Sequence, residues 1–176
     1  MNLHCQETMK DNASELLPLV NEEGTVIGKA SRGECHGGAM LLHPVVHLHV
    51  FDADGCLFLQ HRPAWKDIQP DRWDTAVGGH VDWGETVHQA LLREAREELG
   101  LTEFKPEFIE RYVHRSDRET ELVNVFRTTI DYAPTPSDEL DGGRFFSERE
   151  IRERIGQHFF TPNFEKEWLR IFGQQE

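Results

Sequence analysis

Hydrophobic and polar residues alternate in three parts of the chain, and a short polar turn interrupts each alternating stretch. A period of two residues, with many Val, Ile, Leu and Phe positions, is typical of strands that bury one face. Two of the turns contain glycine, and the third is the charged run 115–119. A turn of this kind between two such stretches favours a β-hairpin. The predicted strand pairs are 16–20 with 25–30, 45–51 with 56–60, and 108–113 with 122–130.

Three other stretches place apolar or helix-forming residues at the spacing of an α-helix. The strongest is rich in Ala, Leu, Glu and Arg, and Gly100 follows it where a helix C-terminus favours glycine. The predicted helices are 86–99, 148–155 and 163–172, and segments 133–136 and 141–143 are predicted loops. We therefore expect an α/β (α+β) fold, with an N-terminal β-hairpin and helices packed on a largely antiparallel or mixed sheet.

The domain organisation follows from length and patterning. Residues 1–14 are polar and unpatterned, so we expect a loosely ordered N-terminus. Residues 15–176 are enough for one domain with a substantial core and too few for two ordinary ones. No exposed apolar stripe indicates a second copy, so the oligomeric state stays open.

Composition limits the kinds of partner. A formal net charge of -13 and a pI near 5.2 would repel the phosphates of a nucleic-acid polymer, whereas clustered carboxylates suit a divalent cation. The chain has three cysteines, without CxxC spacing, which favours neither a disulfide framework nor a zinc knuckle. No apolar run approaches the roughly 18 residues of a membrane span, and the start lacks the apolar segment of a signal peptide. We expect a cytoplasmic protein that does not enter a membrane.

Three carboxylates occupy one face of the predicted helix 86–99. Glu94, Glu97 and Glu98 are spaced i, i+3 and i+4, and the helical phase places two of them in the apolar arc and Glu97 at its edge. The same phase predicts that Gln89, Arg93 and Arg96 face solvent. A solvated acidic face is the ordinary alternative. Three like charges about 6 Å apart, however, repel by roughly 3 kcal/mol per pair at an effective dielectric of 20. A bound cation such as Mg²⁺ would offset that repulsion.

The residues around this helix follow a longer pattern. Gly79, then Glu85, then the run 93–101 (REAREELGL), resembles the Nudix box in full. The resemblance implies an α/β/α sandwich and hydrolysis of a phosphoanhydride bond with Mg²⁺ or Mn²⁺. The implied metal ligands are the Gly79 carbonyl, Glu94, Glu97 and Glu98, and the implied structural pair is Glu85 with Arg93. Glu97 and Glu98 are candidates for the catalytic base, with Glu119, Glu121 and Glu139 outside the box.

The flanking sequence is similar to one Nudix branch, the type I isopentenyl-diphosphate isomerases. His36, His43, His80, Glu119 and Glu121 resemble the five-ligand metal site of that branch. This donor set would suit a second divalent ion such as Zn²⁺ or Mn²⁺. Considered alone, each histidine is more often a hydrogen-bonded or surface residue.

Other matches and departures concern the substrate. Arg62 and Lys66 resemble the basic pair that binds diphosphate in the isomerases, and Tyr112 resembles their active-site tyrosine. Gly78, however, stands where they have their essential cysteine, and Asn163 stands where they have a tryptophan.

Because the box glutamates are all present, we expect hydrolysis of a small nucleoside-diphosphate-type metabolite. The alternatives are an isomerase-like enzyme and a non-catalytic nucleotide-binding module. His47 and His49 share one side of their predicted strand, where they would line the pocket or satisfy each other.

Overall fold

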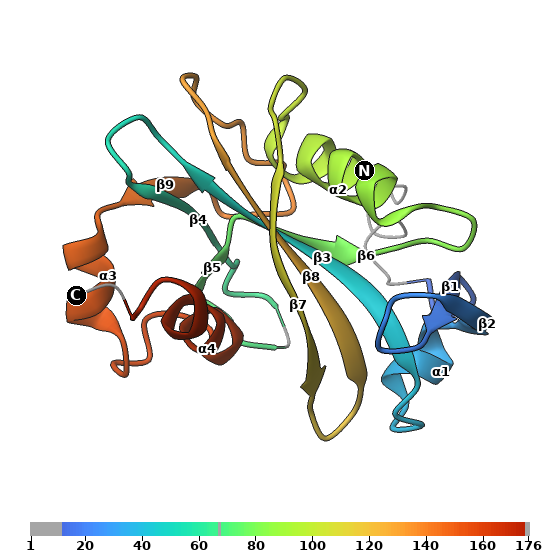
Figure 1. The fold of residues 1–176 in the computed structure, drawn as a ribbon. Coiled ribbons are helices and arrows are strands. Elements are labelled where there is room, and N and C mark those ends of the chain that lie inside the picture. Colours follow the sequence, from blue (N-terminus) through green and yellow to red (C-terminus); the bar gives the residue numbers. More distant parts are fainter. Residues whose placement is uncertain (1–11, 67, 175–176) are drawn as a thin grey trace, which may run out of the picture.

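The computed structural model describes residues 12–66 and 68–174. Most of the predicted loose terminus, 1–14, lies outside the described residues. A seven-stranded twisted sheet forms the centre, with helices on both of its faces and a separate two-stranded sheet at one end (Figure 1). This is the predicted α/β/α sandwich with a mixed sheet and an N-terminal hairpin. In the described part of the chain, no helix is long and apolar enough to cross a membrane.

The sheet is mixed because one of its central pairs is parallel. β3 pairs with β8 in parallel over ten residues, and the other pairs are antiparallel. The main path runs β5-β4-β3-β8-β7, with β6 added to β3 and β9 added to β4. The strands of the large sheet are β3 Leu42–Phe51, β4 Leu57–His61, β5 Trp73–Thr75, β6 Val77–His80, β7 Glu107–Arg115, β8 Thr120–Thr129 and β9 Gly143–Phe146. The small sheet holds β1 Leu16–Val20 and β2 Val26–Ser31, and α1 Arg32–His36 follows it.

One face of β3 packs against α2, Val87–Leu99. Thr86 caps this helix in a capping box with Gln89, and Gly100 ends it in the left-handed conformation at φ 64°. The helix buries a stripe of small and branched residues against alternate positions of the strand. The packed residues are Ala90, Leu91, Ala95 and Leu99 from the helix and Val46, Leu48 and Val50 from β3.

The opposite face of the sheet lies under α3, Glu148–Arg154, and α4, Pro162–Ile171. Thr161 caps α4, and Pro162 occupies its first turn, where a missing N–H costs nothing. Phe164 and Trp168 of α4 are buried in the cluster that includes the inner side chains of β4. The sheet is therefore covered by apolar packing on both faces.

The three predicted hairpins are confirmed, as are the three predicted helices to within a residue or two. The prediction of a loop at 141–143 is wrong at its end, because Gly143 begins β9 and pairs with Gln60. A β-carbon at Gly143 would collide with the ring of Phe58, so close strand approach explains this glycine. Strands β5, β6 and β9 and helix α1 escaped prediction, since three to five residues are too few to show a period.

Candidate active site

Arg93 is the centre of the acidic helix site. Its Nε and Nη2 donate to the two carboxylate oxygens of Glu85 at 2.8 and 2.9 Å, and its Nη1 lies 2.7 Å from Oε1 of Glu94. Nη2 also donates to the carbonyl of His80 at 3.0 Å. The expectation that Arg93 faces solvent is therefore wrong, since its side chain is only 21% exposed. Helical phase alone does not account for the carboxylates that draw the guanidinium inward.

Glu98 and Glu94 lie against the backbone of β6. Glu98 accepts a hydrogen bond from the N–H of Gly78 at 3.0 Å. A β-carbon at Gly79 would overlap the Glu94 carboxyl group, so only glycine permits that approach. Burial raises the pKa of Glu98 well above its ordinary value, and burial also raises the pKa of Glu94. Carboxylates in this condition fit a divalent cation, which would restore their charge.

Glu97 completes the predicted triad but points more toward solvent, with its side chain 55% exposed. Its Oε2 is 3.3 Å from Nη1 of Arg93. In the part of the chain that the structure describes, Glu94, Glu97 and Glu98 do not converge as a tight ligand group. Arg93 holds the Glu94 carboxylate and the N–H of Gly78 holds that of Glu98. The three side chains would therefore have to rotate to surround an ion.

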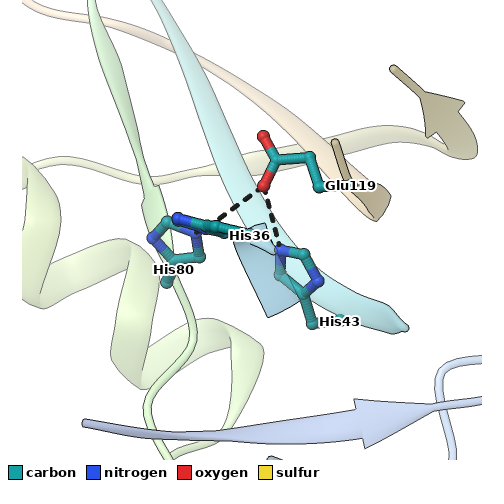
Figure 2. Close-up of side chains that lie close together, drawn as sticks. All are labelled: His36, His43, His80 and Glu119. Atoms are coloured by element: carbon teal, nitrogen blue, oxygen red, sulfur yellow. Dashed lines mark hydrogen bonds and ion pairs between the residues drawn. The ribbon is translucent and has the colours of Figure 1, made fainter. Parts of the chain in front are cut away.

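Four other predicted ligands do converge. Ligand atoms of His36, His43, His80 and Glu119 all lie within 4.8 Å of one another (Figure 2). They come from the end of α1, the start of β3, the end of β6 and the turn before β8. Oε2 of Glu119 is 3.1 Å from Nε2 of His36 and 3.7 Å from Nε2 of His43. The first and last of these residues, His36 and Glu119, are more than 80 positions apart in the sequence, and the fold brings all four to one point.

The chemistry of this cluster fits a metal ion. The Nδ1 of His43 lies 2.9 Å from the carbonyl of Leu41, which leaves Nε2 to face the cluster. That buried Nε2 finds no hydrogen-bond partner among the described residues. Burial lowers the pKa of His43 and, more strongly, that of His80, so both imidazoles are kept neutral. Neutral imidazole is the form that ligates a metal.

Glu121, the fifth predicted ligand, is outside this four-residue group. It lies beside Glu119, and burial together with the Glu119 charge raises the pKa of Glu121 to about 7. Its position borders a second cavity rather than the cluster, since it lines a space of about 250 Å³ with Tyr112 and Asn163. A carboxyl group of that pKa can hold or release a proton near neutral pH.

Arg62 and Lys66 line a cavity of about 180 Å³ whose walls include Gly78, Glu98 and Glu139. Arg62 is partly engaged by its own loop. Its Nε and Nη2 donate to the carbonyls of Ile68 and Gln69, and its Nη1 is 3.6 Å from Asp74. The Nζ of Lys66 lies 5.0 Å from the centre of the Trp65 ring. The predicted basic pair thus borders the same cavity as Glu98.

One buried carboxylate was missed by sequence reasoning. Glu167 on α4 lies 2.6 Å from Nδ1 of His47 and 2.7 Å from Nε2 of His49, and it accepts a hydrogen bond from the Tyr112 hydroxyl at 2.6 Å. Burial alone would lower the pKa of His47, but the charge and hydrogen bond of Glu167 outweigh it and raise that pKa to about 9. The available signal was a glutamate within the apolar arc of the predicted helix 163–172.

Comparison with known proteins identifies the family. Residues 41–168 match the NUDIX domain family, and the chain belongs to it. The chain is 31% identical, over 93% of its length and 91% of the relative's, to an uncharacterized Nudix hydrolase of Streptomyces coelicolor. It is 27% identical to isopentenyl-diphosphate Delta-isomerase 1 of Photorhabdus laumondii, over 89% of this chain and 94% of that protein. The crystal structure of DR0079 from Deinococcus radiodurans has the same fold, with a TM-score of 0.75 at 24% identity, covering 90% of this chain and 99% of that one.

The chain is a Nudix hydrolase by family, and its fold agrees with that assignment. Relatives of the isomerase type are also similar to it. Nudix enzymes generally use divalent metal ions, and this chain contains a group of side chains that could hold one.

Proposed function

We propose that the protein hydrolyses a phosphoanhydride bond in a small nucleoside-diphosphate-type metabolite, with Mg²⁺ or Mn²⁺ as its cofactor. The observation that carries this proposal is the cavity of about 180 Å³, in which the half-buried Glu98 shares the walls with Arg62 and Lys66. A carboxylate for a cation thus lines the same cavity as cationic side chains for phosphate oxygens. A diphosphate bridging the two would use both.

The box residues would hold the ion. The proposed ligands are the Gly79 carbonyl, Glu94, Glu97 and Glu98. The pKa values of Glu94 and Glu98 are raised, which is the condition expected of carboxyl groups that a cation would stabilise in the charged form. When bound, the ion would neutralise phosphate charge and polarise the bond that breaks. Arg93, joined to Glu85 by two hydrogen bonds, would keep the helix and its preceding loop in register.

A glutamate would accept the proton of the attacking water. Glu97 and Glu98 are the candidates within the box. Outside it, Glu139 lines the same cavity, and Glu121, with its pKa near 7, borders the adjoining one. Glu119 is less suited to this role because it belongs to the histidine cluster.

The cluster of His36, His43, His80 and Glu119 would bind a second ion such as Zn²⁺ or Mn²⁺. His36 and Glu119 also line a cavity of about 540 Å³ that includes Arg62 and Asn163. Since Asn163 and Arg62 also border the smaller cavity, the group attached to the diphosphate has space toward the cluster. A combined space of this size suits a nucleoside-sized substituent.

Turnover of a substrate panel tests the proposal. The panel contains nucleoside diphosphate sugars, dinucleotides, nucleoside triphosphates and isopentenyl diphosphate, each with Mg²⁺, Mn²⁺ or Zn²⁺ added separately. We expect metal-dependent hydrolysis that Glu98→Gln lowers at least tenfold. Glu22→Gln, an exposed change in a distant turn, is the matched control and should retain turnover. Equal activity of Glu98→Gln and the control would reject the assignment of Glu98.

An isomerase-like activity is the second candidate, supported by the assembled histidine cluster and the similarity to an isomerase. Against it stands Gly78, which offers no thiol for proton transfer. NMR of isopentenyl diphosphate incubated with the protein and each metal would show dimethylallyl diphosphate if this reading is right. Metal-dependent binding of panel compounds without any turnover would instead assign a non-catalytic nucleotide-binding module.

A further inference from the structure

His47 and His49 share one carboxylate but have different surroundings. Alternation along β3 sends both side chains to the α4 face of the sheet, while Val46 and Leu48 face α2. Glu167 reaches them from α4, and its two oxygens are used by both rings and by the Tyr112 hydroxyl. The carboxylate is buried and fully engaged, so its effect on a ligand must pass through a neighbour.

Only one of the two rings reaches a cavity. The His47 side chain is 20% exposed, whereas that of His49 is 0% exposed. His49 packs edge-on against Phe172, with ring centres 5.2 Å apart. His47 lines both the cavity of about 180 Å³ that contains Lys66 and Glu98 and the adjoining one of about 250 Å³. It forms part of the wall of each.

Glu167 determines which nitrogen of His47 faces that space. The Nδ1 is bound to Glu167, so Nε2 is the nitrogen left for a ligand. A β-carbon at Gly78 would lie 3.8 Å from this Nε2, which places the ring edge beside the strand that carries Gly78. The absence of a side chain at Gly78 therefore leaves Nε2 uncovered on that side.

The charge of His47 also fits an anion. Because Glu167 raises the pKa of His47 to about 9, its ring carries a proton on both nitrogens at neutral pH. Nε2 is then a charged hydrogen-bond donor rather than a base. Arg62, the expected cation in the wall of this cavity, already gives two of its nitrogens to loop carbonyls. A phosphate oxygen in this cavity needs a further donor, and Nε2 of His47 supplies one.

We propose that His47 binds a phosphate oxygen of the substrate through its Nε2–H, and that Glu167 is the positioning residue that aims the ring at the cavity. This inference rests on the proposed function, which makes a diphosphate the occupant. It assigns the diphosphate a contact from the sheet itself, in addition to the loop that carries Arg62 and Lys66. Gly78 would then keep the edge of the His47 ring open to the substrate, since a cysteine side chain at this position would lie against that edge.

Binding of inorganic pyrophosphate with Mg²⁺, measured by titration calorimetry, tests the inference. We expect His47→Gln to weaken binding about ten- to hundredfold, as loss of one charge-assisted hydrogen bond implies. His49→Gln, the matched change on the same strand and the same carboxylate, should weaken it less than threefold. Gly78→Cys should also weaken binding while the His47 bond to Glu167 stays intact. Equal affinities of the wild type and His47→Gln, or no binding by the wild type, would overturn the inference.

Nitrogen NMR of the wild-type histidines provides a readout that needs no variant. Pyrophosphate should shift the Nε2 resonance of His47 and leave the His49 resonances unchanged, and Glu167→Gln should abolish that shift. A His47 resonance that does not respond to saturating pyrophosphate would contradict the proposed contact. Failure of the proposed function is distinguishable: pyrophosphate bound through His47 without hydrolysis of any panel compound rejects the hydrolase and retains this contact.

Discussion

The substitution Glu167→Gln should destabilise the fold in a manner that depends on pH. Glu167 is buried beneath His47, His49 and Tyr112, and glutamine can keep a hydrogen bond to one of them but not the charge. His47 is where the loss is largest, because the carboxylate raises its pKa to about 9. Without that charge, burial of the ring favours the neutral imidazole.

The magnitude follows from the linkage between protonation and folding. An unfolded histidine has a pKa of about 6.5, so a folded value of about 9 corresponds to about 3.4 kcal/mol of stability at acidic pH, at about 1.36 kcal/mol per pKa unit. Because the folded pKa is the raised one, this contribution is full below about pH 6.5 and is lost as the pH rises through 9. It amounts to about 2.5 kcal/mol at pH 7 and almost nothing at pH 9.5.

Urea unfolding followed by tryptophan fluorescence at pH 6, 7 and 9.5 measures this effect. Wild type and Glu167→Gln should differ by about 3 kcal/mol in free energy of unfolding at pH 6, and the difference should shrink at pH 9.5. Glu153→Gln on α3, which removes only an exposed pair with Arg149, should cost less than about 0.5 kcal/mol at each pH. A difference below 1 kcal/mol at pH 6, or one that does not change with pH, would refute the reasoning.

Three further changes test the box and the cluster. Arg93→Lys should lower the free energy of unfolding by about 2 kcal/mol in thermal denaturation, because lysine cannot reproduce the two bonds to Glu85; an unchanged melting temperature would contradict this. Gly79→Ala should lower metal-dependent turnover at least tenfold, as its methyl group would occupy the space of the Glu94 carboxyl, and wild-type rates would show that the helix moves aside freely. His43→Gln should weaken Zn²⁺ binding at least tenfold in a chelator competition assay. Equal Zn²⁺ affinities of this variant and the wild type would contradict the proposed metal site.

The sequence was sufficient to predict the strands and helices that have a regular spacing of hydrophobic residues. Long alternating or helical stretches predicted the hairpins and helix 86–99. Of the five residues that the family resemblance grouped as metal ligands, four converge in the structure and Glu121 does not. Short strands were not predictable in this way. β6, with the sequence Val-Gly-Gly-His, shows no alternation, and its position depends entirely on pairing with β3. Three residues of the candidate site, Gly78, Gly79 and His80, lie on that strand.

Side-chain partners were harder to predict than elements. Helical phase placed Arg93 outside, because the phase considers one helix and not the loop residue Glu85. Glu167 was overlooked although it lies between Phe164 and Trp168, within the buried arc of its helix. The argument applied to Glu94 and Glu98, that a carboxylate in an apolar arc needs a partner, would have marked Glu167 too. Its histidine partners lie 120 and 118 residues away and Tyr112 lies 55 away, so only the fold could identify them.

The pairing of β3 with β6 determines which residues reach each proposed site. Residues directly opposite in an antiparallel pair share a face of the sheet. His47 is opposite Gly78 and Val45 is opposite His80, so these residues lie on the α4 face, while Gly79 and Val46 lie on the α2 face near Glu94. A slip of one residue would reverse every assignment, sending His80 away from the cluster and a side chain toward the box glutamates. The approach of Glu94 to Gly79 on one face and the cavity wall formed by Gly78 and His47 on the other therefore depend on a single register, and neither can be shifted along β6 without disrupting the other.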